Sequence, residues 1–76
     1  MNLERKKALK EAIEAIETGL SALHTIAEDE QEAFDAIPET QQESERAEKM
    51  QEWANNLKEA HEEIENICDN LKSMME

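Results

Sequence analysis

The sequence predicts an all-α fold, an antiparallel and coiled-coil-like hairpin of two long helices that forms a single domain over residues 1–76. Three observations predict it. Apolar residues recur about every 3.5 positions in both halves of the chain, which is the spacing of a helix packed along a supercoiled seam. The only proline, Pro38, separates the two periodic halves. A chain of 76 residues is also too short to form more than one domain.

The first predicted helix covers about residues 3–36. Written in sevens from Ala8, it keeps four columns apolar or small, interrupted only by Asp29 and Glu30. A helix with one broad apolar face follows, because the remaining positions are mostly charged or polar. The four columns are Ala8, Ala15 and Ala22; Leu9, Ile16 and Leu23; Ala12, Gly19, Ile26 and Ala33; and Ile13, Leu20, Ala27 and Phe34.

The predicted turn covers about residues 37–41 and is centred on Pro38. Proline lacks a backbone N–H and disfavours helical dihedral angles in the residue before it, so the first helix ends there. Beyond it, Thr40 and Glu43 have the spacing of a capping box, and Ser44 is a second candidate N-cap. The start of the second helix is therefore defined only to within one turn. A connection this short places the helices antiparallel.

The second predicted helix covers about residues 42–75 and repeats the pattern of the first. Two neighbouring columns are Met50, Leu57, Ile64 and Leu71, and Ala47, Ala54, His61, Cys68 and Met75. A third column widens the apolar stripe and contains Trp53, Ala60, Ile67 and Met74. The stripe is therefore broader than the seam between two helices requires.

The surplus apolar surface predicts self-association. Leaving a large apolar side chain exposed costs about 1.5–3 kcal/mol, and a twofold dimer needs only one self-complementary surface to cover it. We expect a homodimer in the form of a four-helix bundle; the alternative is a monomer whose core these residues thicken. The predicted oligomer face consists of Ile26, Trp53, Ala60, Ile67 and Met74.

Composition and charge exclude several classes of partner. The formal net charge of −12 disfavours direct binding to nucleic acid or to an anionic membrane, since both are polyanions.

No apolar run approaches the ~20 residues that span a bilayer, and the basic N-terminus is not followed by the apolar segment of a signal peptide. Cys68 is the only cysteine, so no internal disulfide can form. We expect a cytoplasmic protein.

Carboxylates are concentrated around the predicted turn. Residues 28–45 contain eight acidic residues and no lysine or arginine. Several of them lie near the C-terminus of the first helix, where the helix dipole favours cations, so helix stability does not predict them. The eight residues, here called the acidic tip, are Glu28, Asp29, Glu30, Glu32, Asp35, Glu39, Glu43 and Glu45.

Two interpretations of the acidic tip remain open. One is a solubilising cap on a small acidic protein. The other is a docking patch for a partner protein with a basic surface, which would be attracted by the field and released by salt. A calcium loop is disfavoured, because the D-x-D-x-D-G spacing is absent.

The basic residues at the start of the first helix have an expected neighbour. In a hairpin they lie at the same end as the acidic residues that finish the second helix, so opposite charges would meet there. The basic residues are Arg5, Lys6, Lys7 and Lys10, and the acidic ones are Glu62, Glu63, Glu65, Asp69 and Glu76.

The histidines and the cysteine do not predict a metal centre. His61 and Cys68 share a helix face and His24 lies in an exposed column, whereas zinc needs about four ligands at recognised spacings. We expect His61 to be a seam residue bonded to a hydroxyl or carboxylate, and Cys68 to be a buried thiol. In a hairpin that turns near residue 40, Gly19 falls opposite His61 and leaves room for the imidazole.

Enzyme signatures are also missing. Lys58 and Ser21 occupy the positions three residues before the two histidines, so the Glu-x-x-His motif of di-iron bundles is absent. One acidic row on the second helix is similar to that of magnesium-binding helical nucleotide hydrolases, but no second row converges on it; its members are Glu59, Glu62, Glu65 and Asp69. We therefore predict a non-enzyme with no catalytic residues, no metal ligands and no cofactor.

The segment DEQEAFDAIPETQQESERAEKMQE (29–52) resembles a family of short, acidic, uncharacterised proteins from phages and Gram-positive bacteria. Their central stretch reads approximately acidic-EQEAFDN-hydrophobic-PES-x-QESER-x-EKMEE. The matching residues are Glu30 to Phe34, Pro38, Glu39, Gln42 to Arg46 and Glu48 to Met50. This chain differs at Thr40, where the family has Ser, and at Gln41, where the family is often apolar. The resemblance implies a small hairpin and a phage or mobile-element origin, and it implies no activity.

The function predicted from these features is a non-enzymatic protein-binding module. The apolar stripe would hold a homodimer together, and the acidic tip would face a protein partner with a basic surface. The alternative is an inhibitor that imitates the charge of nucleic acid and blocks a basic groove of a host or defence nuclease or regulator. The carboxylate density along residues 28–45 and down the second helix favours this alternative.

Overall fold

The first helix begins where the sequence supplies an N-cap. In the computed structural model, which describes residues 1–75, α1 (Leu3–Asp35) follows Asn2, whose Oδ1 accepts a hydrogen bond from the backbone N–H of Arg5 at 2.8 Å. This bond satisfies one of the amide groups left unpaired at a helix start. The extended backbone of Pro38 (φ −56°, ψ 142°) follows shortly after the helix ends, in agreement with the expected effect of proline.

The connection between the helices is longer than the sequence predicts. Residues 36–44 link α1 to α2 (Glu45–Ser73) and include the short 3₁₀ helix η1 (Glu39–Gln41). The side-chain amide of Gln42 donates a hydrogen bond to the backbone carbonyl of Ile37 at 3.1 Å, which ties the two ends of the connection together.

Ser44 is the N-cap of α2. Its Oγ accepts a hydrogen bond from the backbone N–H of Ala47 at 3.2 Å. The other candidate cap, Thr40, lies inside η1, so the helix begins at Glu45 and not at the expected residue 42. Acidic residues in the first turn of α2 and Lys72 in its last turn have the signs that the helix dipole favours.

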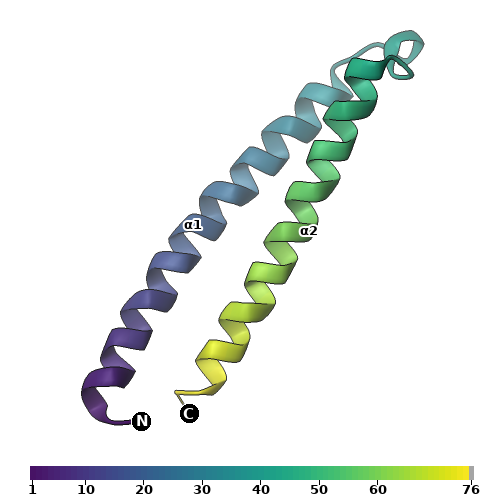
Figure 1. Ribbon diagram of the computed structural model, residues 1–76. Helices are drawn as coiled ribbons and strands as arrows, with labels where there is room; N and C mark the ends of the chain where they lie inside the picture. The colour runs from purple at the N-terminus through teal and green to yellow at the C-terminus, as the bar shows by residue number, and fades with distance from the viewer. Residues whose placement is uncertain (76) are drawn as a thin grey trace.

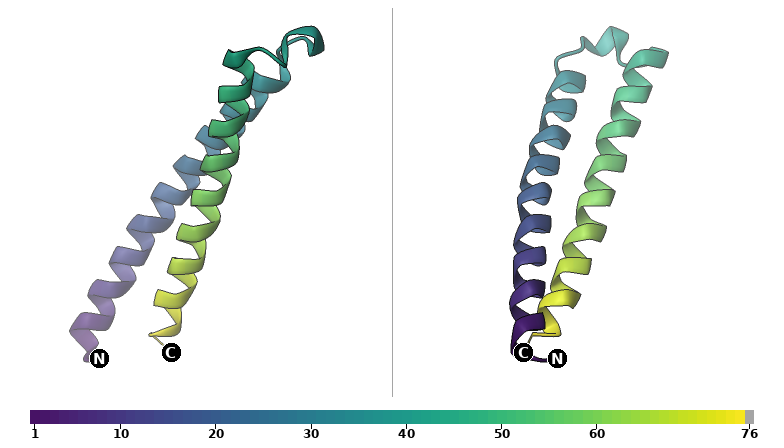
Figure 2. Two further views of the ribbon diagram at one scale, coloured as in Figure 1. Left: turned by 45° about the vertical axis from the view of Figure 1, so that its right-hand side comes forward. Right: turned by 60° about the vertical axis from the view of Figure 1, so that its left-hand side comes forward.

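The two helices lie side by side and antiparallel (Figures 1 and 2). Both chain termini are at one end, and the connection is at the other. With 33 residues in α1 and 29 in α2, the Cα trace measures 59 × 15 × 14 Å. The prediction of an all-α antiparallel hairpin is confirmed.

A single seam runs between the helices. Its side chains are buried or half-buried and alternate at spacings of three and four residues, as in a coiled coil. On α1 the seam contains Leu9, Ile13, Ile16, Leu20, Leu23, Ala27, Glu30 and Phe34. On α2 it contains Ala47, Met50, Ala54, Leu57, His61, Ile64, Cys68 and Leu71. Cys68 is 2% exposed, so its predicted burial is confirmed.

The seam uses only two of the four apolar columns of α1. The columns that begin at Ala8 and at Ala12 are exposed throughout. Within residues 1–75 the buried apolar side chains are few and mostly small or medium in size: Ile13, Leu20, Ala27, Ala47, Ala54 and Cys68. Charged residues cover the outer faces, and neither described helix contains an apolar stretch that could cross a membrane.

Candidate functional site

The fold brings all eight residues of the acidic tip to one end of the hairpin. Five of them are on the last two turns of α1, Glu39 is in η1, Glu43 is in the connection and Glu45 is in the first turn of α2. This end lies opposite the chain termini (Figure 1). Seven of the eight are exposed, and Glu30 is half-buried.

Most tip carboxylates have no cation close by. Glu28 Oε1 lies 2.7 Å from Nε2 of His24, one turn earlier on α1. Asp35 accepts a hydrogen bond from the side-chain amide of Gln31 at 3.0 Å. In the described part of the chain, no tip carboxylate forms an ion pair with a lysine or arginine. The tip is therefore a surface of largely uncompensated negative charge.

Glu30 differs from the other tip residues because it occupies a seam position. It lines a shallow hollow on one side of the hairpin together with Arg46, Lys49, Met50 and Trp53. Arg46 and Lys49 come from the first turns of α2. They reduce the net negative charge on that side of the tip, although neither forms an ion pair with a tip carboxylate in the described residues.

Within residues 1–75, the basic end of α1 forms none of the ion pairs that the sequence predicts, and one expected partner, Glu76, lies outside the described residues. In the range 1–75, the lysine or arginine pair that joins the helices is Lys72 Nζ to Glu17 Oε2, at 3.3 Å. Because this pair lies beside the last turn of α2, the first turns of α1 extend past the end of α2. Arg5, Lys6 and Lys7 are therefore exposed and lie beyond the reach of the expected acidic residues on α2, which are Glu62, Glu63, Glu65 and Asp69.

The oligomer face gathers large apolar side chains that the hairpin leaves exposed. Ile26, Trp53 and Ile67 are each 53% exposed and Met74 is 59% exposed, while Ala60 is half-buried. Apart from Met1 and Leu3 at the chain start, these four are the large exposed apolar residues of the described chain.

All five oligomer-face residues lie on the same side of the hairpin. Four of them precede a seam residue by one position, as Ile26 precedes Ala27 and Trp53 precedes Ala54, and Met74 follows Ile67 at the same spacing of seven residues. Two antiparallel helices are related by a local twofold axis perpendicular to both, which keeps equivalent positions on the same side of the pair. The predicted residues thus lie in rows along one side of the hairpin.

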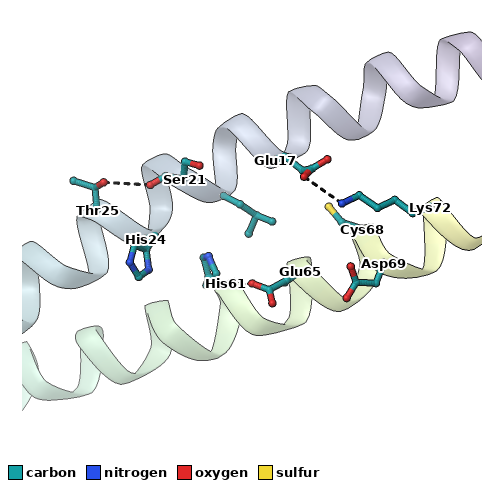
Figure 3. Close-up of a pocket in the computed structure, with 10 residues that line it drawn as sticks. Glu17, Ser21, His24, Thr25, His61, Glu65, Cys68, Asp69 and Lys72 are labelled. Carbon is teal, nitrogen blue, oxygen red and sulfur yellow. Dashed lines mark hydrogen bonds and ion pairs between the residues drawn. The ribbon is translucent and has the colours of Figure 1, made fainter.

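The opposite side of the hairpin is a polar groove that the sequence did not predict (Figure 3). The rings of His24 and His61 face each other across it, with centroids 5.5 Å apart and planes tilted by 51°. His61 occupies the predicted seam position, but its Nδ1 lies 3.7 Å from Glu65 Oε2, which is longer than a hydrogen bond to the expected carboxylate. Further along, Lys58 donates a hydrogen bond to Gln31 at 3.1 Å.

The longer connection explains why this pair was missed. A turn centred near residue 40 places Gly19 opposite His61, but the connection ends only at Ser44, which shifts the register. His24 and Leu20 therefore line the groove beside His61. Gly19 lies outside the groove and is exposed, and a Cβ added there meets no atom within 4 Å. The expectation that Gly19 makes room for the imidazole was wrong.

The polar groove offers hydrogen bonding but not a metal centre. No group of three or more His, Cys, Asp or Glu side chains across residues 1–75 is arranged to hold a metal ion. The same part of the chain contains no buried side-chain nitrogen or oxygen without a hydrogen-bond partner. The three surfaces present negative charge at the tip, exposed apolar side chains on the oligomer face, and hydrogen-bonding groups in the groove.

Comparisons of this chain with protein-family models, with curated proteins and with solved structures find no match.

Proposed function

We propose that this chain is a non-enzymatic protein-binding module that works as a homodimer. The oligomer face holds the second copy, and the acidic tip binds a protein partner with a basic surface. The observation that carries the proposal is the gathering of Ile26, Trp53, Ile67 and Met74 on one side of the hairpin, each more than half exposed. Contiguous exposed apolar side chains of this kind mark interaction sites.

The surface area of the hairpin supports self-association. The hairpin exposes 5900 Å² for a mass of 8.7 kDa. A compact monomer of that mass exposes about 4700 Å², so roughly 1200 Å² is in excess. One seam with six buried apolar residues is a small core, and small domains commonly gain stability by oligomerisation.

The charge of the tip supports a basic partner. Eight carboxylates lie at one end, and within the described residues none of them pairs with a lysine or arginine. Such a surface attracts a positive patch from a distance, which raises the association rate and makes it sensitive to salt. The proposal includes action in the cytoplasm and, from the resemblance of residues 29–52, a phage or mobile-element origin.

A pull-down from bacterial lysate at about 0.05 M and 0.5 M salt tests the role of the tip. The tip-neutral variant carries Glu32→Gln, Glu39→Gln and Glu43→Gln. The matched control carries Glu52→Gln, Glu59→Gln and Glu62→Gln, which removes the same charge from the exposed outer surface of α2. We expect the wild type and the control to retain a basic protein at low salt only. Equal retention by the tip-neutral variant would show that the tip is a solubilising cap.

The second candidate is an inhibitor that imitates nucleic acid. The observation that favours it is the row of exposed acids that continues from the tip down α2, through Glu48, Glu52, Glu59 and Glu62. If this function is correct, the purified chain displaces duplex DNA from the partner that it captures. A partner that binds this chain and DNA at the same time would exclude charge mimicry.

A further inference from the structure

We propose that the second copy binds the oligomer face with the twofold axis along the hairpin, so that both acidic tips lie at the same end. The inference rests on the homodimer of the proposed function and adds its orientation. In this arrangement α1 of each copy lies over α2 of the other. As a consequence, the two acidic tips form a single acidic surface at one end of the dimer.

The argument begins with the register across the oligomer face. On the polar side, the pairs His24–His61, Gln31–Lys58 and Glu17–Lys72 have residue numbers that add up to between 85 and 89. Columns that repeat every seven residues can pair within this range in one register only. On the other side of the hairpin, this alignment pairs the α1 column that contains Ile26 with the α2 column that contains Trp53. The two columns form four layers, each with one residue from α1 and one from α2. From the termini toward the tip, the layers are Ala12 with Met74, Gly19 with Ile67, Ile26 with Ala60, and Ala33 with Trp53.

Each layer contains one large and one small side chain. α1 supplies the small residue in three layers, and in the remaining layer it supplies Ile26 while α2 supplies Ala60. A twofold axis along the hairpin places α1 over α2 of the other copy at the same level. Every large side chain then faces a small one across the interface, as close packing requires.

The other twofold-symmetric dimer that uses this face does not pair large side chains with small ones. A twofold axis across the hairpin places α1 over α1 and α2 over α2, with the tips at opposite ends. Trp53 then meets Met74 and Ala12 meets Ala33, so one side is crowded while the other is left open. Crowded and empty contacts both destabilise a packed interface.

Gly19 supports a close approach on this face. Glycine in the middle of a helix is less favourable than alanine, and Gly19 has neither a positive φ nor a neighbour within the hairpin that would collide with a Cβ. In the proposed dimer Gly19 faces Ile67 of the second copy. The hairpin as a whole measures 59 by 15 Å between Cα extremes, so one complete side of it has an area on the order of the 800 Å² per partner typical of stable interfaces.

Electrostatic repulsion between the two acidic tips opposes this arrangement. The salt dependence of dimerisation therefore distinguishes it from the arrangement with tips at opposite ends. Residues 22–65, the half nearer the tip, contain 14 acidic and three basic residues, whereas the rest of the chain contains six and five. Like charges thus meet when the tips lie together. At 0.15 M ionic strength the Debye length is about 8 Å, so exposed carboxylates on neighbouring hairpins are largely screened while the packing fit is unaffected. The dimer should therefore tighten as salt increases.

Distance measurement between two spin labels tests the orientation. The full chain carries Cys68→Ala and Thr40→Cys, which places one label on the exposed η1 of each copy. With helix axes ~10 Å apart, the proposed dimer gives a label separation of roughly 15–30 Å. The arrangement with tips at opposite ends gives about 50 Å or more at ~1.5 Å per residue. That longer distance would overturn the orientation and leave the homodimer intact.

Gly19→Phe provides a second test that does not depend on labelling. The hairpin has free space at this position, so the helical circular dichroism signal should remain while dimerisation weakens by about 100-fold or more through overpacking. Thr18→Phe is the matched control, because Thr18 is also exposed and lies off the oligomer face. Equal dimerisation of the two variants would overturn the proposed packing. A wild-type chain that sediments as a monomer at every concentration would instead overturn the homodimer of the proposed function.

Discussion

Replacing Trp53 with alanine should break the dimer while leaving the hairpin folded. Trp53 is 53% exposed in the hairpin. A tryptophan side chain has up to about 250 Å² of surface, so roughly 130 Å² remains for a partner to cover. At ~25 cal/mol per Å² this is about 3 kcal/mol per copy, an upper value because the alanine still buries some surface. Since two copies contribute, the dissociation constant should rise by on the order of 1,000-fold or more.

Sedimentation velocity over a concentration series measures this effect directly. The wild type should sediment at twice the chain mass of 8.7 kDa at micromolar concentration, and Trp53→Ala should sediment as a monomer there. Trp53 is the only tryptophan, so its fluorescence also reports burial. Quenching by iodide should decrease in the wild type as the concentration rises through the dissociation constant.

Leu3→Ala is the control for this substitution. Leu3 is 83% exposed but lies at the start of α1, away from the oligomer face. Its replacement should leave the association unchanged. If Trp53→Ala dimerises as well as Leu3→Ala, or if Trp53 stays fully quenchable in a dimer, the oligomer face is not the interface and the reasoning fails.

Three further predictions concern the hairpin itself. Leu20→Ala, at a seam position only 8% exposed, should lower the free energy of unfolding by about 2–5 kcal/mol; an unchanged thermal melt would exclude the observed seam. Ser44→Ala should destabilise by about 1 kcal/mol through loss of the N-cap bond to Ala47, while Thr40→Ala should change the midpoint of unfolding little; the reverse order would place the start of α2 at the other cap. Asp29→Asn with Glu32→Gln should raise the melting temperature at low salt, because each carboxylate near the C-terminus of α1 is unfavourable by about 0.3–1 kcal/mol; a lower melting temperature would mean that these acids stabilise the fold.

Local sequence patterns were sufficient to predict the two helices and their antiparallel direction. The seven-residue repeat identifies which side chains cannot face water on either helix, and proline at residue 38 interrupts backbone hydrogen bonding wherever the chain is placed. The concentration of acids around the turn is likewise a property of the sequence, since a hairpin must bring residues 28–45 to one end. The exposure of Ile26, Trp53, Ile67 and Met74 could also be predicted, because the apolar stripe is broader than one seam can bury.

Only the tertiary structure decided which columns face inward and which residues meet. The register depends on how many residues the connection consumes, and a choice between Thr40 and Ser44 as N-cap shifts it by several positions although both side chains can cap a helix. That shift brings His24 beside His61, moves Gly19 out to the oligomer face, and leaves Arg5, Lys6 and Lys7 beyond the end of α2. The apolar pattern repeats every seven residues, so it is unchanged when one helix slides along the other by a heptad. Only the contacts between the helices distinguish one such register from the next.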